Sequence, residues 1–195
     1  MIDAELWSLF VNAALVNNFV LAYFLGICPY LGVSGRLDSA SRMGAAVTFV
    51  MLIASLCAYG IHQVLTIMDA RYLELIAFIV VIASTVQLVE MFIRKTSPAL
   101  FQALGLYLPL ITTNCAILAV ALFQTQRSYG FVESVVFALG AGAGFTLAMV
   151  LMAGIREKLR LGAVPDMAQG TAITLVLAGI LSLAFMGFAG IGGET

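Results

Sequence analysis

Residues 15–29 read LVNNFVLAYFLGICP, and the predicted architecture starts from this stretch. It lies inside a long run without charged residues, Leu6–Gly35. A straight helix of about 30 residues measures about 45 Å, whereas the hydrocarbon core of a bilayer is about 30 Å thick. Proline removes a helix hydrogen bond, and asparagine side chains can pair with backbone groups that a break frees. We therefore predict a membrane helix that is interrupted around Asn17-Asn18 and residues 26–29.

A second run has the same character. It extends from Thr96 to Gln126 and contains residues 108–115, LPLITTNC. Its proline, threonines and asparagine again precede a cysteine, and Cys115 follows Cys28 by 87 positions. We therefore predict a second interrupted helix. The residues expected to support the two interruptions are Asn17, Asn18, Pro29, Pro109, Thr112, Thr113 and Asn114.

The composition places the whole chain in a membrane. Of its 195 residues, 63% are hydrophobic and 10% are charged, whereas a soluble domain carries about 25% charged residues. Lipid requires backbone polar groups to be paired internally, so the apolar runs are predicted to be helices. The basic residues form no stripe, which excludes nucleic acid as a partner and leaves membrane lipid. Six charge-free runs predict an all-α integral membrane protein with six transmembrane helices: Leu6–Gly35, Met43–Met68, Leu75–Val89, Thr96–Gln126, Ser134–Ile155 and Met167–Gly193.

The two halves of the chain share one order of elements, a long interrupted run followed by two further spans. We interpret the chain as a single membrane domain, residues 1–195, with repeat one at about 1–97 and repeat two at about 98–195. A unit of three spans is odd, so the second copy is expected to lie upside down relative to the first. Two inverted three-helix repeats are therefore predicted, with the first helix of each broken near the bilayer midplane.

The distribution of basic residues predicts the orientation. The connections after the first, third and fifth runs hold seven basic residues, whereas the opposite side holds two, Arg71 and Arg127. The positive-inside rule then places both termini outside the cytoplasm. The seven residues are Arg36, Arg42, Arg94, Lys95, Arg156, Lys158 and Arg160.

Cys28 and Cys115 are the candidate ligand residues. An inverted twofold axis would bring them together near the bilayer centre; the alternatives are a disulfide, or two small buried hydrophobic residues. An iron–sulfur cluster usually requires four cysteines, so two more would have to come from a partner. Helix N-termini aimed at the midplane would compensate the negative charge of such a cluster, and Asn114 could cap one of these helices. Cys57 has no counterpart in the other half and is interpreted as packing.

Other polar or small residues have structural interpretations. Glu90 ends the third run four residues before Arg94, which favours an interfacial ion pair over an ion or proton relay. His62 is likewise expected near an interface. The glycines of residues 140–144 favour close helix packing rather than phosphate binding. For the asparagines and threonines of the interruptions, lining an ion path and hydrogen bonding between helices are equal alternatives.

Three segments carry a family resemblance. Residues 15–21, LVNNFVL, residues 24–34, FLGICPYLGVS, and residues 108–116, LPLITTNCA, closely resemble the A subunits of Rnf electron-transport complexes. The similarity extends over the full chain, and related subunits occur in the sodium-pumping NADH:quinone reductase. The resemblance implies a bacterial inner-membrane complex that couples electron flow between ferredoxin and NAD to movement of Na⁺ or H⁺. It also implies periplasmic termini and enzymatic activity only as part of the translocase complex.

The resemblance further implies a cofactor and partners. In this family the A subunit pairs with a homologous E subunit of opposite orientation, and a 2Fe-2S cluster is held between the two by two cysteines from each. Carried over to this sequence, the iron ligands are Cys28 and Cys115. The other implied partners are the B, C, D and G subunits of the complex. No catalytic side chain is implied.

Two other classes of protein compete with this interpretation. A stand-alone inverted-repeat secondary transporter or channel shares the interrupted helices, although no run here has a charged residue near its middle. A redox-inactive membrane scaffold is the other alternative. Transport by the purified chain alone would favour the transporter, and electron flow after removal of both cysteines would favour the scaffold.

Overall fold

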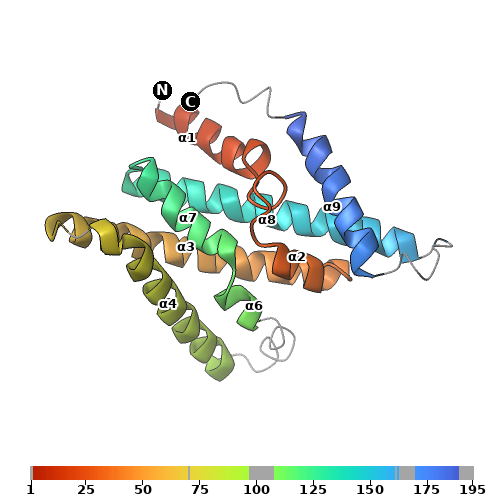
Figure 1. The fold of residues 1–195 in the computed structure, drawn as a ribbon, viewed down its shortest axis with the longest axis horizontal. Coiled ribbons are helices and arrows are strands. Elements are labelled where there is room, and N and C mark those ends of the chain that lie inside the picture. The colour runs from red at the N-terminus through yellow and green to blue at the C-terminus, as the bar shows by residue number, and fades with distance from the viewer. Residues whose placement is uncertain (1, 70, 97–107, 161, 163–169, 189–195) are drawn as a thin grey trace.

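A computed structural model describes residues 2–69, 71–96, 108–160, 162 and 170–188 of the chain (Figure 1). Within these ranges the regular structure is entirely helical, which confirms the predicted all-α class. The elements are α1 (Ile2–Val11), η1 (Asn12–Val16), α2 (Ile27–Val33), α3 (Leu37–Ile67), η2 (Arg71–Leu73), α4 (Glu74–Thr96), α6 (Leu108–Thr112), α7 (Cys115–Gln126), α8 (Phe131–Arg160) and α9 (Thr171–Met186). The expected boundary between the repeats, near residue 97, lies outside the described residues.

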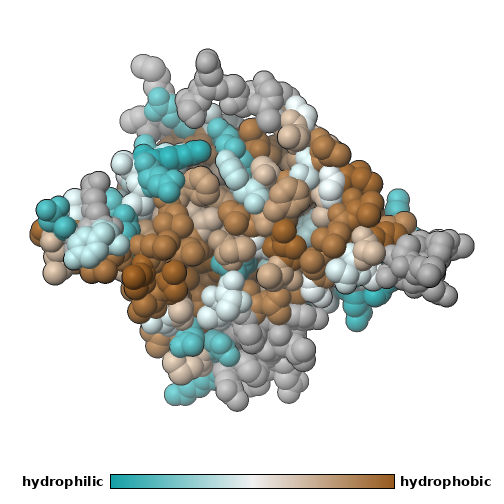
Figure 2. All heavy atoms as spheres, in the orientation of Figure 1, coloured by the Kyte–Doolittle hydropathy of each residue, from teal (hydrophilic) through white to brown (hydrophobic). Residues whose placement is uncertain are grey.

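Within the described ranges, three helices are long and apolar enough to cross a membrane: α3, α8 and residues Glu74–Met91 of α4. Three shorter apolar helical segments of these ranges, Ala4–Val16, Leu110–Gln126 and Thr171–Met186, overlap the first, fourth and sixth predicted runs. Large apolar side chains are exposed along the outer helices, with Ile76 of α4 at 60% and Leu183 of α9 at 71%. Figure 2 shows hydrophobic residues over the middle of one face and hydrophilic ones toward its margins. This surface fits a multi-pass membrane protein.

The two long helices extend beyond the predicted charge-free runs. α3 begins at Leu37 rather than near Met43, and α8 ends at Arg160 rather than near Ile155. Long basic side chains can lie along a helix while their charged heads remain in water, so a helix continues past the last apolar residue. The added turn of α3 contains an ion pair, in which Arg42 Nε lies 3.2 Å from Asp38 Oδ1.

The centre of the fold is the pairing of α3 with α8, which run side by side in Figure 1. Gly44 of α3 lies against Thr146 of α8, since an added Cβ would come within 2.6 Å of Thr146 Cγ2. Gly142 lies against Thr48 in the same way, with an added Cβ 2.5 Å from Thr48 Cγ2. Glycine allows the two backbones to approach closely in the absence of a hydrophobic driving force within lipid.

The same glycine-rich turns of α8 hold the first helical segment. An added Cβ on Gly140 would lie 2.9 Å from the carbonyl oxygen of Phe10, and one on Gly144 would lie 2.5 Å from that of Ala14. The run of residues 140–144 therefore packs helices on two sides of α8, as the sequence predicts.

Both long runs are interrupted. In the first, α1 continues into the π-helical turn η1, residues 17–26 are irregular, and α2 begins at Ile27. In the second, only Thr113 and Asn114 separate α6 from α7. The two interruptions thus differ in length, because the first leaves helical geometry for several residues and the second only at a cap.

Candidate functional site

The two interruptions adjoin at Gly26 and Cys115. The backbone N–H of Gly26 donates a hydrogen bond to Cys115 Sγ over 2.9 Å. Gly26 has φ +79°, and an added Cβ would lie 2.9 Å from Phe145 Cε2 and 3.0 Å from Asn114 Oδ1. The left-handed conformation and the lack of space both require glycine at this position. The start of α2 is therefore fixed against the start of α7.

Both candidate cysteines lie at helix starts. Cys28 is the second residue of α2, and Cys115 is the first residue of α7. Both are free and exposed, while Pro29 and Ala116 beside them are buried. The free N–H groups at the start of α7 carry partial positive charge beside Cys115.

Asn114 supports the start of α7. Its Oδ1 accepts a hydrogen bond from the Ala116 N–H at 3.0 Å, which confirms the predicted cap. The residue is 5% exposed, and its buried Nδ2 has no hydrogen-bond partner among the described residues. A buried donor left unpaired costs on the order of 1–3 kcal/mol. An acceptor for this amide would have to come from outside the described residues.

These features fit one half of an iron–sulfur site. The thiols of Cys28 and Cys115 are exposed, and the backbone N–H of Gly26 donates to one of them. The surroundings of Gly26 leave no room for a side chain, and Asn114 beside Cys115 carries an unpaired amide donor. A cluster of this kind usually needs four sulfur ligands. The described part of the chain contains no group of three or more potential metal ligands.

Asn18 replaces the backbone hydrogen bonds that the first interruption breaks. Its Nδ2 donates to the carbonyl oxygens of Ala14 at 3.1 Å and Gly144 at 2.8 Å. Its Oδ1 accepts from the N–H groups of Val20 at 3.0 Å and Leu21 at 3.3 Å. The side chain is 0% exposed. Asn18 therefore joins η1, the irregular segment and α8. Of the two alternatives, lining an ion path and hydrogen bonding between helices, its contacts favour the second.

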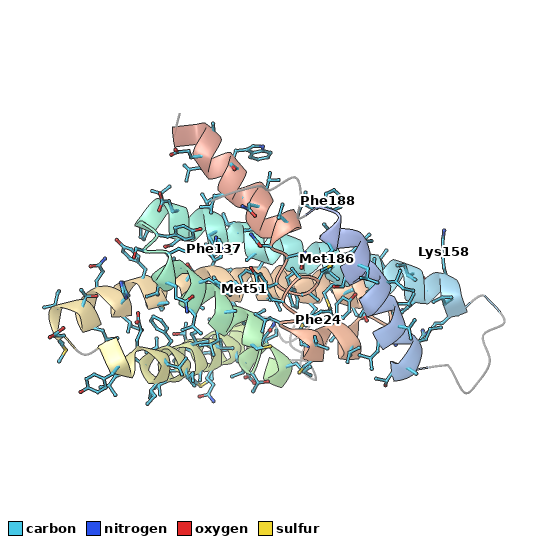
Figure 3. The ribbon with its side chains drawn as sticks, turned by 45° about the horizontal axis from the view of Figure 1, so that its top comes forward. Phe24, Met51, Phe137, Lys158, Met186 and Phe188 are labelled. Carbon is cyan, nitrogen blue, oxygen red and sulfur yellow. The ribbon has the colours of Figure 1, made fainter. Side chains whose placement is uncertain are left out.

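Asn17 lies in a different environment. Its Nδ2 donates to Asn12 Oδ1 at 2.7 Å, and its Oδ1 accepts from the hydroxyl of Tyr23 at 3.2 Å. It is half-buried and lines a cavity. Farther along the irregular segment, Phe24, labelled in Figure 3, is 48% exposed and has φ 56°.

The other residues predicted to support the interruptions lie in α2, in α6 or directly after α6. Pro29 is buried in α2, Pro109 lies in α6, Thr112 ends α6 and Thr113 stands between α6 and α7.

Three residues that the sequence analysis interpreted as structural or interfacial, Cys57, His62 and Glu90, lie on α3 and α4. Cys57 of α3 is half-buried and accepts a weak contact from Thr85 Oγ1 of α4 at 3.9 Å. His62 Nδ1 lies 2.7 Å from Glu74 Oε1 and joins the end of α3 to the start of α4. Glu90 is half-buried on α4, and the side chain of its expected partner Arg94 lies outside the described atoms.

The hydrogen bonds of Asn12 and Tyr23 with Asn17 were not predicted from the sequence. A polar residue five positions before Asn17 was the available signal, because that spacing becomes a side-by-side pair only in a π-helical turn.

Comparisons with known proteins give the family. The family described as "Rnf-Nqr subunit, membrane protein" matches residues 6–192. The chain is 58% identical over 188 residues to the A subunit of the ion-translocating oxidoreductase complex of Syntrophotalea carbinolica, covering 96% of this chain and 97% of that one. It is 55% identical over 181 residues to the A subunit of the Na(+)-translocating ferredoxin:NAD(+) oxidoreductase complex of Acetobacterium woodii, covering 92% and 94%. The chain therefore belongs to the Rnf-Nqr family of membrane subunits.

Proposed function

We propose that the chain is the A subunit of an ion-translocating ferredoxin:NAD oxidoreductase of the Rnf type in a bacterial inner membrane. The proposal is supported by identities of 58% and 55%, over almost the whole length, to relatives that carry subunit names of such complexes. Because these relatives are subunits of complexes, we expect the chain to contribute to catalysis within the assembled complex.

The observation that carries the proposed role is the junction of the two interruptions. Cys28 and Cys115 would hold one side of a 2Fe-2S cluster, and the homologous E subunit of opposite orientation would supply the other two cysteines. When bound, the cluster supplies one-electron transfer between the two faces of the membrane. The N–H of Gly26, which lies 2.9 Å from Cys115 Sγ, stabilises negative charge on that sulfur.

The residues around the junction keep water from one side of the site. Phe145 is 0% exposed and faces Gly26, and Ala116 is 0% exposed beside Cys115. The exposed cysteines then face outward, where a partner subunit can reach them. The half-site fits a shared cofactor better than a self-contained one, because its open side is the side that carries the ligands.

The proposed arrangement has six transmembrane helices in two inverted repeats, residues 1–97 and 98–195, with both termini in the periplasm. Reciprocal contacts between α3 and α8 support it. Gly44 faces Thr146 and Gly142 faces Thr48, and the Thr48 and Thr146 hydroxyls lie 3.3 Å apart across 98 positions. Each of these helices follows an interrupted segment. Coupling to Na⁺ or H⁺ movement requires that charge at the junction change the relative stability of two arrangements of these halves.

Electron paramagnetic resonance of the dithionite-reduced complex tests the cluster assignment. Cys28→Ser and Cys115→Ser should each remove a 2Fe-2S signal while the complex remains assembled, as judged by native electrophoresis. Cys57→Ser is the matched control and should keep the signal. Survival of every signal in both variants would contradict the assignment and favour a scaffold. Ion transport by the purified chain alone in liposomes would favour the stand-alone transporter.

A further inference from the structure

The helix that carries Cys28 is too short to hold its own position. α2 has seven residues, and Cys28 is the second of them. Helices shorter than about 12 residues are marginal by themselves, so α2 depends on contacts with the rest of the fold. Burial of Pro29, Tyr30 and Val33 holds it against the core, but apolar burial has no direction. Directional contacts at the ends of α2 are therefore needed to fix the place of Cys28.

Arg156 of α8 binds the C-terminal end of α2. Its Nη1 donates to the carbonyl oxygen of Leu31 at 3.2 Å and to Ser34 Oγ at 2.9 Å. The last carbonyl groups of a helix have no partner within it, and this end carries partial negative charge. Ser34 directly follows α2 and is 0% exposed. One guanidinium thus closes the end of α2 with a positive charge and two directional hydrogen bonds.

The direction of Arg156 distinguishes it from other basic residues at this end of α8. Basic side chains near the end of a membrane helix commonly extend toward water. Lys158, labelled in Figure 3, is exposed and points away from the fold. Arg156 is half-buried and instead reaches groups 122 and 125 positions earlier in the chain. Within the described ranges it forms no ion pair, so its charge is directed at α2.

Both ends of α2 contact side chains of α8. At the beginning, a Cβ added to Gly26 would lie 2.9 Å from Cε2 of Phe145, and at the other end stands Arg156. Met149 and Met152, which lie between these two positions of α8, are 0% exposed. Because α8 is packed so tightly here, it is a firm support for both contacts.

We propose that Arg156 is a positioning residue for the 2Fe-2S site, because its hold on the end of α2 sets where Cys28 lies relative to Cys115. This inference rests on the proposed function, in which both cysteines are ligands. Cys115 has support of its own, from the Asn114 cap of α7 and from the N–H of Gly26. Loss of Arg156 is therefore expected to displace Cys28 and to leave Cys115 in place.

The first test measures how firmly the assembled complex keeps its cluster. Decay of the 2Fe-2S paramagnetic signal is followed in an excess of an iron chelator. Arg156→Met should speed the decay by about tenfold, the change expected for loss of one hydrogen bond to a charged group. Arg156→Lys restores the charge without the planar fork and should decay at an intermediate rate. Lys158→Met removes an equal charge two positions away and is the matched control, with the decay rate of the parent.

The second test compares the two thiols after the chelator has removed the cluster. The alkylation rates of Cys28 and Cys115 are measured in one sample by mass spectrometry. Thiol reaction rates follow access to the sulfur, and an α2 without its clamp exposes Cys28 more often. Arg156→Met should therefore raise the ratio of the Cys28 rate to the Cys115 rate, whereas Lys158→Met should leave this ratio unchanged.

Two results would overturn the inference. The first is an equal rate of signal decay in Arg156→Met and Lys158→Met. The second is a parallel rise in the alkylation of both cysteines in Arg156→Met, which would show a general loosening of the fold rather than a displacement of α2.

A variant that fails to assemble does not end the test. Ser34→Ala removes one of the two acceptors of Arg156 and should also speed the decay. Combined with Arg156→Lys it should add less than the sum of the two single effects, because both act on one contact. Decay at the parent rate in Ser34→Ala and in Arg156→Lys would overturn the inference.

Failure of the proposed function is distinguishable from failure of this inference. If Cys28→Ser keeps the cluster signal, the cluster assignment falls. The alkylation comparison then still applies to the parent cysteines, and a selective rise at Cys28 in Arg156→Met would support the placement of α2 by Arg156.

Discussion

The backbone N–H of Gly26 donates a hydrogen bond to Cys115 Sγ across 2.9 Å, although the two residues lie 89 positions apart in the chain. This contact fixes the start of α2 against the start of α7. It requires a left-handed residue without a side chain, and it directs a backbone donor at one of the two exposed thiols. Geometry at the junction is therefore set by one glycine and by the residues that surround it.

Gly26→Ala should destabilise the complex and weaken the cluster signal. The left-handed conformation costs a residue with a Cβ about 1–2 kcal/mol, and that Cβ would lie 2.9 Å from Phe145 Cε2 and 3.2 Å from Ala116 Cβ. Thermal unfolding of the detergent-purified complex measures the effect. Gly60→Ala is the control, because no atom lies within 4 Å of a Cβ there. Its midpoint should stay equal or rise, since alanine favours a helix over glycine.

Substitutions of Asn114 should separate its two functions. Asn114→Ser keeps an acceptor for the Ala116 N–H but removes the amide donor, whereas Asn114→Ala removes both. The alanine variant should lose about 1 kcal/mol of stability with the cap, and the serine variant less. Both should lower the reduction potential of the cluster. A tenfold change in the equilibrium constant for reduction corresponds to about 59 mV for one electron. A redox titration followed by paramagnetic resonance measures this, and equal potentials in all three proteins would exclude a role for the amide.

Asn18→Leu should be the most destabilising single change at the first interruption. Leucine has a similar size but leaves the N–H groups of Val20 and Leu21 and the carbonyl oxygen of Gly144 without their partner. Each buried unpaired group costs about 1–3 kcal/mol, so we expect a loss on the order of 3 kcal/mol or more and poor assembly. Native electrophoresis and thermal unfolding report it. Ser84→Ala, at an exposed position of α4, is the control. Stability equal to that of the control would show that other groups form hydrogen bonds with these backbone N–H and carbonyl groups.

Gly142→Ala should disturb the pairing of α3 with α8, because its Cβ would meet Thr48 Cγ2 at 2.5 Å. Overpacking of this kind costs about 1–3 kcal/mol. Adding Thr48→Ala should recover part of the loss, since the two sites are in contact and their effects are coupled.

The reciprocal pair Gly44→Ala with Thr146→Ala should behave alike, because Gly44 faces Thr146 as Gly142 faces Thr48. Thermal unfolding of the single and double variants completes both cycles. Strict additivity in both cycles would mean that the contact carries no specific packing energy.

The class of the protein and the places where its helices break could be predicted from the residues alone. Long charge-free runs can be stable only in lipid, and lipid permits only internally bonded helices at such positions. The run Leu6–Gly35 is longer than a helix that crosses the bilayer, so its interruption was predictable. Asn114 was predictable as a cap, because a cap is a local arrangement of adjacent residues. The residues of the two interruptions also indicated the family.

Which distant groups meet could not be predicted and is known only from the packing of the helices. The contacts of Gly26 with Cys115, of Asn18 with Gly144 and of Thr48 with Thr146 join positions 89, 126 and 98 residues apart. No periodicity encodes such pairs, because they depend on how whole helices pack. The π-helical turn at Asn12 was hidden for the same reason. A wide turn is unfavourable alone and persists where close packing on α8 and side-chain hydrogen bonds compensate it.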